Sequence, residues 1–201
     1  MYRKGLRCDR MNFLEERIVR DGIVAEGNVL KVDSFLNHQI DVELLDQFAD
    51  ELYKKYKDAG INKILTIEAS GIAIASSVAR VFKTPLVFAK KSKSVNLSGD
   101  VYASTITSFT YKKEYQVMVS KKFIGPEDNV LIVDDFLATG NAMLGLIDIC
   151  ETAGTKISGI GICIEKGYQG GRKEIEDRGY DVTSIAIVES MNAADGSIVF
   201  K

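Results

Sequence analysis

The sequence predicts an α/β fold with a mostly parallel, twisted sheet and helices on both of its faces. Strand patterns and helical patterns alternate along the chain with short breaks, as in folds built from strand–helix–strand units. Residues 130–133 are apolar without a break, which suits a strand buried on both faces of a parallel sheet. Charged residues follow several predicted strands, where open α/β sheets bind their ligands.

Local patterns place the elements in order. A helical segment begins at Met11, and Asp41 can cap the next helix, whose apolar residues recur at helical spacing to about Ala59. Pro85 opens a strand, and Gly154 can end a helix. The later helices are predicted at about 71–82, 138–153 and 172–178. The strands are predicted at 63–68, 86–90, 101–110, 115–120, 130–133, 157–165, 182–188 and 198–200.

Size and composition limit the classes of function. The chain has 201 residues, 46% hydrophobic and 27% charged, which predicts one globular domain over 11–201. Residues 1–10, which include four basic side chains, are expected to be an upstream extension. A net charge of −2 gives a general nucleic-acid role no electrostatic support. The longest apolar stretches are far too short to cross a bilayer, so we expect no membrane partner and a cytoplasmic location.

The cysteine and histidine content disfavours disulfide frameworks, zinc sites and histidine-based catalytic sites. Cys8, Cys150 and Cys163 are odd in number and form no C-x-x-C pair, so reduced structural thiols are expected. His38 is the single histidine, which disfavours a histidine-rich metal cluster or a Ser-His-Asp triad. We expect His38 to be structural, and no metal site made by protein side chains alone.

The most informative motif follows the apolar run at 130–133. Asp134 and Asp135 come first, and their carboxylates can accept hydrogen bonds from ribose hydroxyls. A small-residue segment opens the next helix, and its N–H groups can face a phosphate. We call this segment the phosphate loop; its residues are Ala138, Thr139, Gly140, Asn141 and Ala142. Together the two parts predict a sugar-phosphate site.

Two further segments carry groups suited to anions. A second turn, which we call the pyrophosphate loop, follows the strand at 63–68 and can offer free N–H groups at a helix start. Its residues are Glu68, Ala69, Ser70 and Gly71. Lys90 and Lys91 end the next strand, where their charges could offset a pyrophosphate. The polar segment 91–116 has the composition of a loop that closes over a ligand.

The acidic pair and phosphate loop together resemble the 5-phosphoribosyl-1-pyrophosphate (PRPP) site of the type I phosphoribosyltransferases. Ala142 departs from the hydroxyl residue that this family often has there. The resemblance implies PRPP as substrate, Mg²⁺ bound mainly through PRPP, a homodimer, and a small hood lobe from residues 28–40 and 166–201. In it, Asp134 and Asp135 are the catalytic residues, and the phosphate loop, the pyrophosphate loop, Lys90 and Lys91 bind PRPP.

The run at 31–41 and the segment 164–172 resemble the bacterial xanthine phosphoribosyltransferases more closely. By that likeness Leu30, Asn37 and Lys166 contact the base, Lys166 faces a purine keto oxygen, and Glu165 is a candidate partner that orients it. The implied reaction transfers the phosphoribosyl group from PRPP to xanthine in purine salvage. Ser70 stands where the adenine branch usually has arginine.

Other interpretations stay open at this point. The chain could be a transferase for adenine, or for guanine and hypoxanthine. It could also be a PRPP-sensing purine regulator of the same fold, or a nucleotide-binding module without chemistry. Either carboxylate of the acidic pair could act as the base toward the purine.

Overall fold

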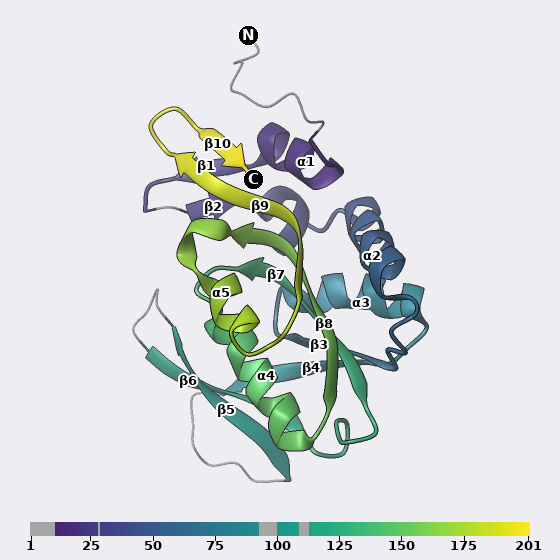
Figure 1. The fold of residues 1–201 in the computed structure, drawn as a ribbon. Helices are drawn as coiled ribbons and strands as arrows, with labels where there is room; N and C mark the ends of the chain where they lie inside the picture. The colour runs from purple at the N-terminus through teal and green to yellow at the C-terminus, as the bar shows by residue number, and fades with distance from the viewer. Residues whose placement is uncertain (1–10, 28, 93–99, 109–112) are drawn as a thin grey trace.

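The computed structural model describes residues 11–27, 29–92, 100–108 and 113–201 (Figure 1). The proposed extension 1–10 and Cys8 lie outside these residues, as do 93–99 and 109–112 of the expected closing loop. A sheet runs through the molecule, with helices packed on both sides of it and a smaller lobe at one end. The α/β class predicted from the sequence is therefore confirmed.

The main sheet has eight strands in the order β10-β9-β8-β7-β3-β4-β6-β5. Its five central strands are parallel, and β10, β6 and β5 are antiparallel to their neighbours. The strands are β3 (Lys63–Ile67), β4 (Leu86–Ser92), β5 (Val101–Ser108), β6 (Lys113–Ser120), β7 (Asn129–Leu137), β8 (Lys156–Lys166), β9 (Val182–Asn192) and β10 (Ser197–Phe200).

The chain order reverses between β3 and β7. The strand after β3 lies on one side of it, at β4, and the strand after β7 lies on the other side, at β8. Such a reversal leaves a crevice at the carboxyl ends of the two middle strands, which is where open α/β sheets bind ligands. The pyrophosphate loop follows β3 and the phosphate loop follows β7.

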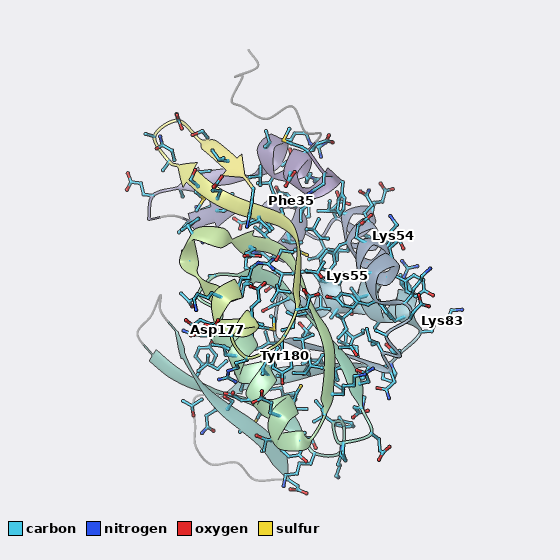
Figure 2. The ribbon with its side chains drawn as sticks, viewed as in Figure 1. Phe35, Lys54, Lys55, Lys83, Asp177 and Tyr180 are labelled. Carbon is cyan, nitrogen blue, oxygen red and sulfur yellow. The ribbon has the colours of Figure 1, made fainter. Side chains whose placement is uncertain are left out.

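Helices cover the two faces of this sheet (Figure 1). On one face, α2 (Val42–Tyr56) and α3 (Gly71–Phe82) pack on each other, and the side chain of Asp41 caps α2 as predicted. On the other face lie α4 (Asn141–Ala153) and the short α5 (Gly171–Glu176). Lys54 and Lys83 project outward from the α2–α3 face (Figure 2). No helix of the described residues has the length and apolar character needed to cross a membrane.

The smaller lobe joins the two ends of the described chain (Figure 1). It contains α1 (Phe13–Asp21), the hairpin of β1 (Ile23–Ala25) and β2 (Val29–Lys31), and the one-turn helix η1 (Asp33–Asn37). The side-chain Nδ2 of Asn12 donates to the carbonyl of Ile185 on β9 at 2.7 Å. Phe35, on η1, is fully buried within this lobe (Figure 2). The assignment of 28–40 and 166–201 to a hood over the substrate stays a prediction.

Candidate active site

The acidic pair lies within β7, whereas the sequence predicted a strand that ends at Val133. Pairing between β7 and β3 is last seen at Ile132, but pairing between β7 and β8 continues to Leu137. The long neighbour β8 keeps the chain extended through two carboxylates, which a strand pattern based on hydrophobicity does not predict. Asp134 and Asp135 therefore lie where β7 runs past its paired segment with β3.

The pyrophosphate loop approaches the acidic pair at Gly71, the first residue of α3. A Cβ atom at Gly71 would lie 2.2 Å from Thr66 Oγ1 and 2.9 Å from Asp134 Oδ1. Thr66 is completely buried, and its hydroxyl has no hydrogen-bond partner among the residues that the structure describes. The peptide bond between Glu68 and Ala69 is cis. The absence of a side chain at Gly71 thus lets α3 begin directly against the carboxylate of Asp134.

The charge environment of Asp134 is asymmetric. Burial raises its pKa well above the ordinary carboxyl value, and the neighbouring charge of Asp135 raises it further. The Lys91 ammonium acts in the opposite sense and lowers that pKa. The Lys91 backbone N–H donates to Glu68 Oε1 at 2.7 Å, and its Nζ lies 5.6 Å from the centre of the Tyr115 ring. Lys91 therefore links the pyrophosphate loop electrostatically to the acidic pair.

Lys90 occupies a different environment from Lys91, because successive side chains of a strand point to opposite faces. It lines an apolar groove of about 430 Å³ together with Phe88 and Met118. Of the two predicted lysines, only Lys91 is brought close to the acidic pair by a described interaction.

The phosphate loop leads from β7 into α4. Gly140 has a φ of +86° and precedes Asn141, where the helix begins. The first amides of a helix have no carbonyl partner inside it, so the start of α4 is a place in the fold that suits an anion. A short turn supports the loop, because the N–H of Gly171 donates to the carbonyl of Ala138 at 3.1 Å.

The three predicted base contacts come from two parts of the chain. Lys166 ends β8, and its Nζ lies 5.9 Å from the centre of the Phe136 ring, one residue beyond Asp135. Partial burial lowers the pKa of Lys166 from its ordinary value. Leu30 is buried on β2, and Asn37 is exposed at the end of η1. Of these three residues, Lys166 is the one whose described contact is with a neighbour of the acidic pair, Phe136.

Comparison with known proteins decides the family. A model of the phosphoribosyl transferase domain matches residues 31–195. The chain belongs to the phosphoribosyltransferase family. It is 56% identical to a xanthine phosphoribosyltransferase of Lachnoclostridium phytofermentans over 95% of this chain and 98% of that protein. It is 55% identical to the enzyme of that name from Bifidobacterium adolescentis, over 95% of this chain and all of that one.

Solved phosphoribosyltransferases share the fold. The structure of the Giardia lamblia adenine enzyme with 9-deazaadenine is similar at a TM-score of 0.70 and 30% identity, covering 84% of this chain and 93% of that one. An adenine phosphoribosyltransferase of Rhodothermus marinus has a TM-score of 0.71 at 23% identity, over 86% and 97% of the two chains. The latter likeness shows the fold alone.

The structure adds partners that the sequence did not single out. Arg172 donates to both oxygens of Glu165, which ties this carboxylate to α5; the orientation of Lys166 by Glu165 stays a prediction. Thr66, Tyr115 and Phe136 lie beside predicted site residues of this phosphoribosyltransferase. No local motif marks Tyr115, because only the pairing of β6 with β4 brings it beside Lys91.

We expect Asp134→Asn to stabilise the folded protein at neutral pH. The pKa of Asp134 is raised in the folded state, because the folded protein disfavours the ionised carboxylate. The free energy of unfolding therefore falls as the pH rises from the ordinary carboxyl pKa to the raised pKa of the folded state. Asparagine carries no charge and keeps the oxygen that accepts the Asp135 N–H at 3.0 Å. Thermal unfolding at pH 4 and pH 8 tests this: the gain in melting temperature should be larger at pH 8, and an equal difference at both pH values would contradict it.

Proposed function

We propose that this phosphoribosyltransferase moves the 5-phosphoribosyl group of PRPP to xanthine, forming xanthosine 5′-monophosphate and pyrophosphate in purine salvage. Curated relatives at 50–56% identity, aligned over 95% of the chain, are xanthine phosphoribosyltransferases. The main structural support for the proposal is that the acidic pair lies between the phosphate loop, which follows it in the chain, and the pyrophosphate loop, which approaches it at Gly71. These groups lie on both sides of the β3–β7 reversal, as a substrate with phosphates at both ends requires.

Each group has a role set by its chemistry. The reaction breaks the bond between the anomeric carbon and pyrophosphate, and positive charge develops on the ribose as in glycoside cleavage. Asp134 and Asp135 would accept hydrogen bonds from the ribose hydroxyls and place negative charge near the ribose. The amides of the phosphate loop would hold the 5′-phosphate. The pyrophosphate loop and Lys91 would hold the leaving group and favour its departure.

Mg²⁺ fits this donor set. Two adjacent carboxylates offer hard oxygen ligands, which Mg²⁺ prefers, and it keeps several waters or substrate oxygens. Among the described residues no group of three acidic, histidine or cysteine side chains could hold a metal by itself. We therefore propose that Mg²⁺ is held mainly by PRPP, with Asp134 and Asp135 adjoining it. When bound, it supplies charge neutralisation of the pyrophosphate.

Base selection is assigned to Lys166. A purine keto oxygen accepts hydrogen bonds from an ammonium, and xanthine has two keto groups. Adenine presents an amino donor instead, which an ammonium would repel. We propose Leu30 and Asn37 as further base contacts from the smaller lobe. Homodimer formation and a cytoplasmic location stay predictions.

The substrate assignment is tested with a panel of purines. The chain is incubated with PRPP, Mg²⁺ and xanthine, guanine, hypoxanthine or adenine, and both nucleotide and pyrophosphate are measured. We expect the highest kcat/KM with xanthine. Preferred turnover of adenine would overturn the base assignment, and PRPP binding without pyrophosphate release would favour a regulator of the same fold.

Lys166→Ala is expected to raise KM for xanthine about 10-fold or more, since a charged hydrogen bond contributes about 1.5–3 kcal/mol. KM for PRPP should change much less, because Lys166 lies at the Phe136 side of the acidic pair. Lys173→Ala is the matched control: its side chain is 76% exposed and pairs with Asp177, the residue that caps the end of α5. Equal effects on both substrates would remove Lys166 from the base site.

A further inference from the structure

A largely buried ion pair lies behind the phosphate loop. Glu165, near the end of β8, is 3% exposed, although it carries a carboxylate. Arg172 Nε lies 2.9 Å and 3.1 Å from its two oxygens, and Nη2 lies 2.6 Å from Oε2. The hydroxyl of Ser184 on β9 also donates to Oε2, at 2.5 Å. The planar guanidinium thus grips the carboxylate with a fixed orientation.

The remaining donors of Arg172 extend this grip. Nη1 donates to the carbonyl of Val182 at 2.9 Å and to Glu176 Oε1 at 3.1 Å. Arg172 is the second residue of α5, so one side chain joins the start of that helix to both β8 and β9. Ile175, fully buried in the core cluster that includes Met143 of α4, anchors α5 separately. The ion pair is therefore not the only contact that keeps α5 in place.

Gly171, which precedes Arg172, is the residue that contacts the phosphate loop. Its N–H donates to the Ala138 carbonyl at 3.1 Å. A Cβ atom at Gly171 would lie 2.4 Å from that oxygen and 2.7 Å from the Gly140 nitrogen, so the two backbones pack directly. Any shift of the start of α5 is then transmitted to the loop, because no side chain lies between them to absorb it.

We propose that the Glu165–Arg172 pair is a positioning element, which holds the phosphate loop in its anion-binding geometry through Gly171. Backbone amides bind a phosphate well only if they already point at it, since reorganising them costs affinity. Arg172 and Glu165 do not themselves contact substrate in this assignment. The inference rests on the proposed function for its ligand, PRPP, but the position of the loop can be measured without any ligand.

The test removes the guanidinium with Arg172→Met, which keeps an unbranched side chain. Hydrogen exchange of a peptide covering 138–142, measured by mass spectrometry without ligand, should speed up about 10-fold. A peptide covering 68–71 should exchange as in the wild type. The Kd for PRPP with Mg²⁺ and no base should rise about 10-fold, less than the 10²-fold that a misplacement of about 1 Å can cause. KM for xanthine at saturating PRPP should stay within about 2-fold of the wild type.

Lys173→Met is the matched control, because it changes the next residue of α5 without touching Glu165. Arg172→Lys, which keeps the charge, should recover part of the PRPP affinity. If Arg172→Met does not fold, Glu165→Gln replaces it with the same expectations. A lower melting temperature with unchanged loop exchange and unchanged Kd for PRPP would overturn the inference. Lack of activity of the wild type on xanthine would overturn the proposed function and leave the loop-exchange result standing.

Discussion

Asp135→Asn is expected to lower kcat about 10²-fold while the protein stays folded, and Asp134→Asn should lower it by a similar factor. Removing one preorganised electrostatic group from an active site typically costs 10²–10³ in kcat. Asparagine keeps the shape and one acceptor oxygen of each carboxylate but removes the negative charge. The loss should therefore fall on the charged transition state, and steady-state kinetics with xanthine and PRPP should show a change in kcat larger than that in either KM.

The matched control is Asp148→Asn on α4. That carboxylate accepts hydrogen bonds from Arg178 and from the Ser104 hydroxyl. Neither partner belongs to the proposed site. We expect it to leave kcat within about 2-fold, in keeping with a partly exposed pair. If Asp134→Asn and Asp135→Asn both turn over at near-normal rates, the catalytic role of the acidic pair is wrong.

Much of the fold could be predicted because local signals agree with the tertiary structure. Asp41 caps α2 as expected, Gly154 ends α4 with a φ of +70°, and the apolar run 130–133 is completely buried. The sequence predicted a mostly parallel sheet but not the order of its strands, so the reversal between β3 and β7 is known from the structure alone. Family resemblance then supplied the substrate, which no periodicity contains.

The remaining features depend on contacts between distant segments. The β7 strand extends through Asp134 and Asp135 because β8 continues beside it, and charged residues give no strand signal. Glu165 pairs with Arg172 and Ser184, so its burial depends on two other elements. Tyr115 faces Lys91 only because β6 pairs antiparallel with β4. Sequence spacing places residues at the ends of strands but does not choose their partners across the sheet.

Gly71→Ala is expected to destabilise the fold by about 1–3 kcal/mol and to weaken PRPP binding more than 10-fold, because overpacking forces local backbone shifts. The new Cβ atom would lie 2.2 Å from Thr66 Oγ1 and 2.9 Å from Asp134 Oδ1. Thr66 is fully buried and β-branched, so its side chain has little room to turn away. The helix start at α3 and the pyrophosphate loop must move instead, and the loop amides would lose their alignment on the leaving group.

A second substitution identifies the cause of that loss. In the double variant Gly71→Ala/Thr66→Ala, the hydroxyl at 2.2 Å is gone, so part of the stability should return. Gly125→Ala is the control, since a Cβ atom there meets nothing within 4 Å. Melting temperatures should differ by about 2–4 °C per kcal/mol for a chain of this size. If Gly71→Ala matches Gly125→Ala in both melting temperature and PRPP affinity, close contact at Gly71 does not shape the site. If adding Thr66→Ala restores the stability of Gly71→Ala but not its PRPP affinity, that affinity depends on the remaining contact with Asp134.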